Sequence, residues 1–178
     1  MKIFAVLLLA GVPALKVPDP VAFPGPAEAK DPTGRYAVVA SATDPKAGAA
    51  GAGHELSLRV EKSGATRGLL TFGRSARVFW APDGNAVAVT DRRNGSASKA
   101  YLFFPDRPES VDLDAELART LGPLPERDRN GHVYLEVVRW LSAKTLRVRL
   151  HGYGANDPEG FDELFDYELG GRFRRAAI

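Results

Sequence analysis

The sequence predicts a mainly β fold built from antiparallel sheets with one short helix. Three observations support this fold class. Short apolar or alternating segments follow one another at regular spacing, a single segment has helical periodicity, and a pattern of a tryptophan followed by a turn recurs. The chain has 178 residues, of which 44% are hydrophobic, and this suits one domain with its own core.

Residues 1–14 have the pattern of a signal peptide. Lys2 supplies the charge, the apolar run of residues 3–12 is shorter than the ~20 residues that span a bilayer, and Ala14 suits cleavage. Ala29 is a second cleavage candidate, and a buried N-terminal strand is the alternative interpretation. We expect export, either to a bacterial periplasm or as a secreted protein. The sequence contains no cysteine, so neither a lipid anchor nor a disulfide scaffold is expected after cleavage.

The strand predictions begin after a proline-rich arm at residues 15–34, which leads into a single β-rich domain at residues 35–178. Residues 55–62 show the clearest alternation, because Leu56 and Leu58 face one way and polar residues face the other. The other segments expected as strands are residues 35–41, 67–72, 77–80, 86–90, 100–104, 132–140, 146–150 and 163–169.

Residues 111–121 are expected to form the one helix. Ser110 suits the N-cap position, acidic residues follow in the first turn, and three leucines recur at four-residue spacing. Gly122 and Pro123 then end the helix. We expect this helix to cap an exposed edge or face of a sheet, where unpaired strands are a liability. The acidic residues are Asp112 and Asp114, and the leucines are Leu113, Leu117 and Leu121.

The recurring pattern occurs in three places. Residues 80–89, WAPDGNAVAV, align with residues 140–149, WLSAKTLRVR, and the part that begins at Pro82 aligns with PTGRYAVV from Pro32. A polar or glycine-rich loop and then an amphipathic strand follow each copy. These loops are residues 42–53, 91–99 and 151–160.

The segment WAPDG at residues 80–84, with AVAVTDRRNG and KAYLF after it, resembles the TolB-like β-propeller repeat. In that repeat, a Trp-Ser-Pro-Asp-Gly turn links the first two strands of a blade. The resemblance implies antiparallel, blade-like sheets with Trp80 and Trp140 packed in the core between them. A closed propeller usually has about four or more blades, and this chain has fewer copies of the repeat. We therefore expect an incomplete or open propeller, a sandwich, or a ring closed by association with another chain.

The sequence contains no catalytic motif. It has no cysteine nucleophile and no Gly-x-Ser-x-Gly segment, and His54, His132 and His151 lack metal-binding spacing. The glycine-rich segment at residues 48–53 precedes a strand rather than a helix, so it lacks the helix N-terminus that binds phosphate. We therefore expect no catalytic residue, no cofactor and no metal. The balance of 24 basic and 22 acidic residues disfavours nucleic-acid binding.

The first candidate binding segment is the predicted loop at residues 151–163. It carries His151, Asp157, Glu159 and Asp162. Oxygen ligands on a flexible loop are the type that calcium prefers, but their spacing matches no EF-hand. A charged loop that joins two strands is also commonly just solvated.

The second candidate is the equivalent loop at residues 91–99. Arg92 and Arg93 suit an acidic partner, and Asp91 is expected to satisfy backbone groups of the turn. If the copies share blade geometry, the loops gather at one end of the structure, and binding sites usually arise on such loops.

These observations favour a non-enzymatic module that binds a protein partner or a small ligand at the clustered loops. One alternative is a hydrolase or lyase that uses the loop carboxylates with His151 for acid–base chemistry. Another is an assembly protein that closes a sheet by forming a homo-oligomer. The hydrolase or lyase alternative requires His151 and the loop carboxylates to lie within hydrogen-bond reach of one another in a cleft, whereas a binding module would leave them spread over the loop.

Overall fold

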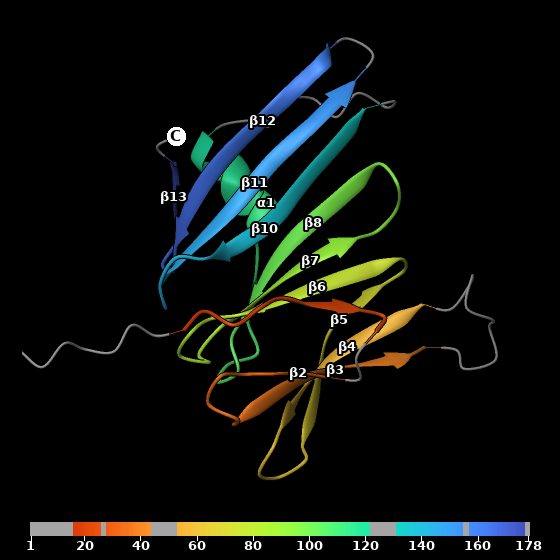
Figure 1. Cartoon of the computed structure of the whole chain (residues 1–178), viewed down its shortest axis with the longest axis vertical. Coiled ribbons are helices and arrows are strands. Elements are labelled where there is room, and N and C mark those ends of the chain that lie inside the picture. The colour runs from red at the N-terminus through yellow and green to blue at the C-terminus, as the bar shows by residue number, and fades with distance from the viewer. Residues whose placement is uncertain (1–15, 26–27, 44–52, 122–130, 155–156, 177–178) are drawn as a thin grey trace, which may run out of the picture.

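The computed structural model describes residues 16–25, 28–43, 53–121, 131–154 and 157–176. It confirms a mainly β fold with antiparallel sheets, one short helix and no closed barrel. The strands form three consecutive units, which we name the first, middle and third unit, and Figure 1 shows them one after another along the long axis of the molecule.

The first unit is a four-stranded antiparallel sheet at one end of the molecule. Its first strand lies within the predicted proline-rich arm. Its strands are β2 (Glu28–Lys30), β3 (Tyr36–Ala42), β4 (His54–Val60) and β5 (Thr66–Phe72).

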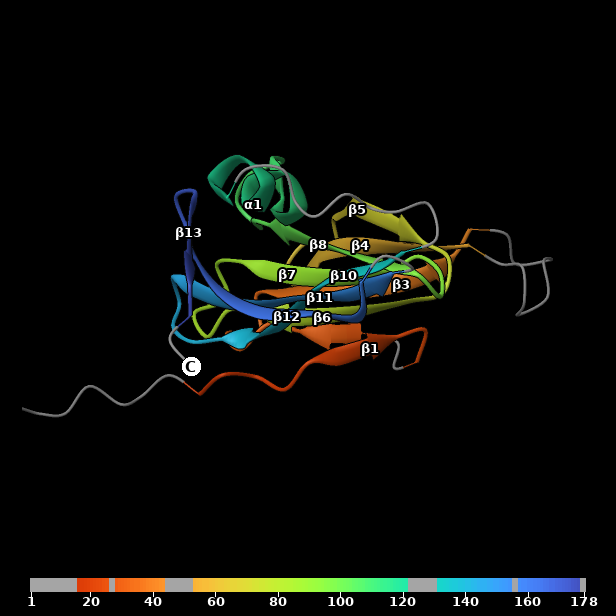
Figure 2. The same cartoon turned by 90° about the horizontal axis from the view of Figure 1, so that it is seen from above.

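The middle unit lies between the other two and is extended at its inner edge by a second strand from the arm, β1 (Val21–Phe23), which pairs with β6. Its strands are β6 (Ser75–Trp80), β7 (Val87–Arg92), β8 (Ala97–Phe103) and the short β9 (Ser110–Asp112). Figure 2 shows β1 on one side of the strands and the helix α1 (Leu113–Leu121) on the other.

The third unit is again antiparallel, and its first three strands are the longest of the described structure. It is joined to the middle unit by a short parallel contact between β8 and β10, at Ala97 with Val133 and Ser98 with Tyr134. Its strands are β10 (His132–Trp140), β11 (Thr145–Gly154), β12 (Asp157–Glu168) and β13 (Arg172–Arg175).

The two tryptophans confirm the prediction that they pack in the core. Trp80 and Trp140 are 3% and 2% exposed. The indole N–H of Trp80 donates to the carbonyl oxygen of Ala29 at 2.9 Å, and that of Trp140 donates to the carbonyl oxygen of Phe79 at 2.9 Å. Ala29 and Phe79 occupy the same position in the aligned copies, so each tryptophan binds the first strand of the unit before its own.

The middle unit is buried on both faces, because the side chains of its central strand β7 are apolar on both sides. Val87 and Val89 point into a core shared with the first unit. Ala88 points into a second core shared with the third unit and with α1. We call these contacts the first junction and the second junction.

The outer faces of the first and third units are polar. On the first unit, the Arg59 guanidinium lies 2.6 Å from a carboxylate oxygen of Glu28. On the third unit, the Nε of Arg147 lies 2.8 Å from the carboxylate of Asp166. The middle and third units belong to one nine-stranded sheet, and the first unit is a separate four-stranded sheet. We call this series of three units the stack, and charged pairs lie on the first and the third unit.

The predicted turns are present, and two of them pack together. Gly34 and Gly84, which end the Pro-Thr-Gly and Pro-Asp-Gly turns, have positive φ values of 71° and 69°, a conformation that glycine adopts without steric cost. A Cβ on Gly84 would lie 2.3 Å from a carboxylate oxygen of Asp31. Arg35 bridges the turns by donating to the carbonyl oxygen of Asp83 and to Oδ1 of Asn85.

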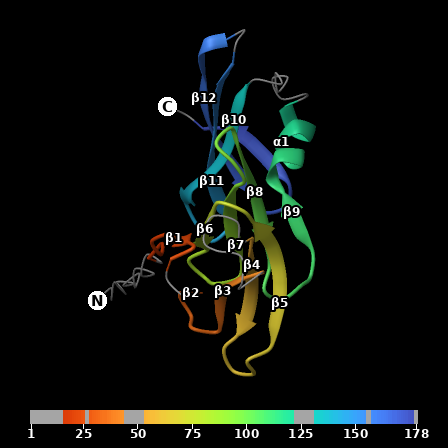
Figure 3. The ribbon, with the colours of Figure 1, turned by 90° about the vertical axis from the view of Figure 1, so that its right-hand side faces the viewer.

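The helix begins later than the sequence predicts. Residues 110–112 form β9, and the carboxylate of Asp112 accepts from the backbone N–H of Ala115, so Asp112 rather than Ser110 is the N-cap. Leu113 and Leu117 are buried, but Leu121 is 46% exposed, so Leu121 does not continue the buried face that the leucine spacing predicts. The carboxylate of Asp114 accepts from the backbone N–H of Ala100, so the start of α1 satisfies a group of β8. Figure 3 shows α1 continuing from β9 and lying beside the third unit.

The two candidate loops are shorter than predicted because the strands beside them extend further. Strand β7 includes Asp91 and Arg92, and β8 resumes at Ala97. Strand β11 runs to Gly154 and β12 begins at Asp157, so residues 151–163 are mostly a strand pair rather than a loop. Among the described residues, no helix is long and apolar enough to cross a membrane.

Candidate functional site

Strand alternation separates the three candidate residues that are adjacent in the sequence. Asp91 lies on the face of β7 that turns toward the first unit, Arg93 follows directly after β7, and both line a pocket at the first junction. Arg92 lies on the opposite face and lines a groove at the second junction. The expected Asp91–Arg93 cluster therefore contributes to two different sites.

The groove at the second junction, which we call the arginine groove, has a volume of about 420 Å³. Arg74 and Arg92 approach it from the middle unit, and Arg149 approaches it from β11. Glu136 is the one acidic residue among its described lining residues. Two of the three guanidinium groups are paired with carboxylates, Arg92 with Glu136 and Arg149 with Asp162, so Arg74 supplies the unpaired positive charge of the groove.

The arginines of this groove differ in their partners. Arg92 pairs with Glu136 at 2.8 Å, and Arg149 donates through Nε to Asp162 at 2.8 Å. Hydrogen bonds from Arg149 lower the pKa of Asp162. Arg74 makes a long 3.5 Å contact with the carbonyl oxygen of Asn94, and it has no ion pair with another described residue. Its charge is therefore the most available for a ligand.

Aromatic rings line the wall of the groove on β10 and β11. Tyr134 stacks on His151 with a centroid distance of 5.0 Å, and its hydroxyl donates to the carbonyl oxygen of Gly95 at 2.6 Å. That hydroxyl also lies 2.7 Å from Nδ1 of His132, which stacks on Tyr153. Burial raises the pKa of Tyr134. These contacts fix the wall, and they bring together two histidines that are isolated in the sequence.

His151 has an unusual environment within this wall. Its Nε2 is buried, has no hydrogen-bond partner among the described residues, and lies 3.6 Å from a carboxylate oxygen of Glu136. Asp162 lies opposite His151 in the register of β11 and β12, but its carboxylate is bonded to Arg149.

The other candidate residues of the third unit do not join this group. Glu159 is exposed on β12. Asp157 begins β12, and its side chain lies outside the described structure. Thus, of the four candidates between residues 151 and 163, the structure places His151 in the groove and Asp162 beside its Arg149.

Sequence reasoning missed Arg74, Tyr134, Glu136 and Arg149. The alternation of the segments 132–140 and 146–150 indicated that their polar residues share one face. What it did not show was the strand register, which sets Tyr134 opposite His151 and Glu136 opposite Arg149.

The pocket at the first junction has a volume of about 550 Å³. Asp91 is 1% exposed, and one of its carboxylate oxygens accepts from Nε of Arg93 at 3.0 Å. The other oxygen, Oδ1, is buried and has no hydrogen-bond partner among the described residues. Burial raises the pKa of Asp91. The expectation that Asp91 satisfies a turn was therefore wrong, because it lies within a strand and pairs with a side chain.

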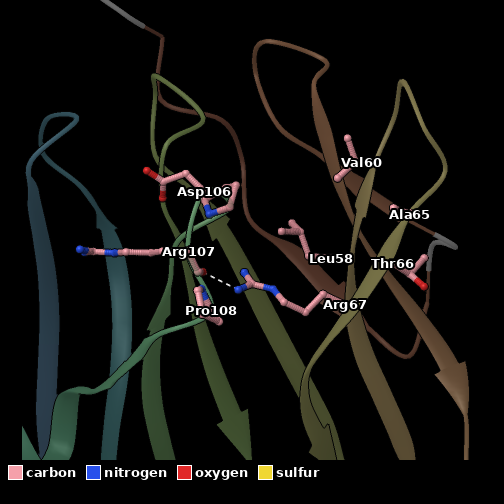
Figure 4. A pocket seen from close by; sticks show the side chains of 9 residues that line it. Leu58, Val60, Ala65, Thr66, Arg67, Asp106, Arg107 and Pro108 are labelled. Atoms are coloured by element: carbon pink, nitrogen blue, oxygen red, sulfur yellow. Dashed lines mark hydrogen bonds between the residues drawn. The ribbon is translucent and has the colours of Figure 1, made fainter.

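A third pocket, of about 300 Å³, lies at the opposite end of the first junction (Figure 4). Arg67 enters it from β5 and donates to the carbonyl oxygens of Phe104 and Arg107. Its guanidinium therefore connects the first unit to the turn between β8 and β9, and this contact is structural.

Among the described residues, no group of three or more His, Cys, Asp or Glu side chains is placed to hold a metal ion. The sequence matches no protein-family model and no curated protein.

Proposed function

We propose that this protein is a non-enzymatic binding module whose arginine groove takes a small anionic ligand, such as a carboxylate or a phosphate ester. The observation that carries this proposal is Arg74, whose charge has no ion pair with a described residue and lies in the groove beside the Arg92–Glu136 and Arg149–Asp162 pairs. Guanidinium groups bind carboxylate and phosphate oxygens through paired hydrogen bonds.

Arg74 is the best residue with which to test this proposal. Because it has no ion pair with a described residue, Arg74→Gln removes a charge without leaving a carboxylate unpaired. Calorimetric titration of the folded protein with inorganic phosphate and with citrate should show binding of at least one of these anions. Loss of one charged hydrogen bond should weaken that binding about tenfold or more.

Arg172→Gln is the matched control, because Arg172 is exposed on β13 and does not line the groove. It should leave the affinity within about twofold of the wild type. Equal weakening by both variants would indicate a general charge effect and contradict a specific groove. If neither anion binds, the proposal is also contradicted.

The geometry gives less support to the hydrolase or lyase alternative. An acid–base catalyst works best with a pKa near the working pH, whereas Arg149 lowers the pKa of Asp162. Asp162 is bonded to that arginine rather than directed at His151. The nearest carboxylate to His151 is that of Glu136, which is already paired with Arg92.

We also propose that the three units are blades of a TolB-like open propeller. The support is the repeated bond from each tryptophan to the first strand of the preceding unit. Because both outer faces carry charged pairs, we expect a monomer rather than a ring of several chains. Light scattering after size exclusion tests this, and a stable oligomer would favour the assembly alternative.

Export is also part of the proposal, and its support is the signal-peptide pattern of residues 1–14. These residues lie outside the described structure. Expression of the full chain in a Gram-negative host should yield a periplasmic protein that begins at Leu15. N-terminal sequencing checks this, and a cytoplasmic product that still begins at Met1 would contradict it.

A further inference from the structure

The turn between β7 and β8 places an asparagine followed by a glycine at the rim of the arginine groove. Asn94 and Gly95 both line the groove, and both are exposed to solvent. An asparagine in this position can react with its own backbone, because glycine has no Cβ to keep the next backbone nitrogen away from the side-chain amide. Such an intramolecular attack is fast when the two groups are held close together.

We infer that Asn94 is a site of covalent self-modification, which converts a neutral side chain at the rim of the groove into a negative one. Hydroxide removes the proton from the backbone nitrogen of Gly95, and this nitrogen attacks Cγ of Asn94. The new N–C bond closes a succinimide ring, and the bond between Cγ and Nδ2 breaks, so that the amide nitrogen takes a proton from water and leaves as ammonia. A second water molecule then opens the ring to aspartate or isoaspartate, and either product carries a carboxylate.

The side-chain carbonyl of Asn94 is held and polarised for this attack. Its Oδ1 accepts from the backbone N–H of Ser96 at 2.9 Å and from the hydroxyl of Ser96 at 3.1 Å. Negative charge develops on this oxygen when the nitrogen attacks Cγ, and the two hydrogen-bond donors stabilise that charge. The turn therefore activates the side-chain carbonyl and also fixes its position.

The attacking nitrogen is available as well. Because β7 ends at Arg92 and β8 begins at Ala97, the backbone N–H of Gly95 is outside the strand ladder, and it donates no hydrogen bond to another described residue. The carbonyl oxygen of Asn94 belongs to the same peptide group, and Arg74 contacts this oxygen at 3.5 Å. A deprotonated peptide group shares its negative charge between the oxygen and the nitrogen, so the guanidinium of Arg74 favours the reactive form.

The modification would change the groove through Arg74. This arginine has no ion pair with a described residue, and its guanidinium already contacts the backbone of Asn94. A carboxylate on the same residue would attract it, and the unpaired positive charge of the groove would be neutralised. This consequence for ligand binding rests on the proposed function, whereas the modification itself does not.

The experiment incubates the folded full chain in mildly alkaline buffer and follows each asparagine by peptide mass spectrometry. The modification replaces an amide NH₂ with OH, and peptide masses assign this change to Asn94 or to Asn130, which also precedes a glycine and lies outside the described residues. Asn85 is the internal control, because it is exposed in a turn and its Oδ1 also accepts a hydrogen bond, but the buried Ala86 follows it. Asn94 should convert about tenfold faster than Asn85, or more.

Two variants test the geometry. Gly95→Ala should preserve the turn, because the φ of Gly95 is not positive and the nearest atom to its new Cβ would be Nη1 of Arg74 at 4.0 Å. It should slow conversion of Asn94 about tenfold, since the Cβ hinders the nitrogen. Arg74→Gln should slow it about threefold, because the positive charge beside the peptide group is lost. If Asn94 converts no faster than Asn85, or if either variant converts as fast as the wild type, the inference is wrong.

Calorimetric titration of Asn94→Asp with phosphate and with citrate tests the consequence for binding separately. The affinity should fall about tenfold relative to the wild type, whereas Asn85→Asp, which does not line the groove, should leave it within about twofold. If Asn94→Asp binds as tightly as the wild type, the inferred neutralisation of Arg74 is wrong. If the wild type binds neither anion, the proposed function is wrong, and the mass measurement still decides whether Asn94 is modified.

Discussion

The two junctions of the stack are built by the same device but have different chemistry. At each one, a tryptophan donates its indole N–H to the first strand of the preceding unit at 2.9 Å. The pocket at the first junction contains an ion pair between the buried Asp91 and the exposed Arg93, whereas the groove at the second contains Arg74, which has no ion pair with a described residue. The repeat therefore determines how the units stack, and the side chains near the loops determine what each junction can bind.

The packing of the middle unit explains how the two junctions can differ. Its faces are independent, because successive residues of β7 point to opposite sides. A substitution at Asp91 or Arg93 therefore changes the first junction, and one at Arg92 changes the second. Three adjacent positions in the sequence therefore contribute to two separate surfaces.

The largest expected effect comes from removing a tryptophan. Trp80→Ala and Trp140→Ala should each lower the free energy of unfolding by about 3–5 kcal/mol, because both leave a cavity in a dry core. Urea denaturation measures the loss. Trp→Phe at the same positions keeps most of the apolar area and should cost less. If one alanine variant costs less than half of the other, the two junctions are not energetically equivalent.

The two glycine turns provide the next test. Gly34→Ala places a side chain at positive φ in open space, which costs about 1–2 kcal/mol. Gly84→Ala has the same backbone cost and also brings a Cβ to 2.3 Å from Asp31, whose carboxylate is held by the backbone N–H of Thr33 and Tyr36. Its loss of stability should exceed that of Gly34→Ala by about 1 kcal/mol or more. Equal losses of stability in the two variants would contradict this and would show that the turn at Asp31 and Thr33 moves away from the new Cβ at no cost.

The ion pairs on the polar face of the third unit, the face that also supplies Arg149 to the arginine groove, should differ according to their exposure. The side chains of Asp166 and Arg147 are 9% and 21% exposed, whereas those of Asp162 and Arg149 are 56% and 45% exposed. Asp166→Asn should lower the free energy of unfolding by about 1–3 kcal/mol, because it leaves a poorly solvated guanidinium with a weaker partner. Asp162→Asn should cost at most about 1 kcal/mol, since exposed pairs contribute little. The reverse order in thermal unfolding would contradict this.

The smallest expected effect is a difference in pH dependence between the two sites. Arg149 lowers the pKa of Asp162, so this pair stabilises the protein above the unfolded pKa and loses that contribution as the pH falls through the folded pKa. Burial raises the pKa of Asp91, so mild acidification through its folded pKa should instead favour the folded state. As the pH falls from about 7 to 3, the melting temperature of the wild type should fall relative to that of Asp162→Asn and rise relative to that of Asp91→Asn. Deviations of the same sign would contradict these assignments.

Several local features were predictable because they depend on neighbouring residues in the chain. The Pro-Asp-Gly turn has the positive φ at Gly84 that its residues require. The alternation of residues 55–62 correctly placed Leu56 and Leu58 in a core. The start of the helix was predicted too early, because pairing with β8 keeps Ser110 extended and leaves Asp112 to cap the helix.

The candidate site was predicted only in part, and His151 shows why. It was selected as one polar residue of a loop, but it lies on a strand, with Tyr134 stacked against it from the neighbouring strand. Arg74 had no distinguishing signal in the sequence, because its importance depends on the other arginines that share its groove.

The sequence by itself determined the longer strands, the turns and the positions of the repeated tryptophans, since these follow from alternation, turn residues and recurrence within short segments, whereas it missed the short strands β1, β2, β9 and β13. The tertiary structure alone decided that Asp91 and Arg92 serve different junctions, and that Arg74, Arg92 and Arg149 meet. The physical reason is that charge and hydrogen bonding act through space. The register and stacking of whole sheets set those distances, and no local segment of the chain specifies them.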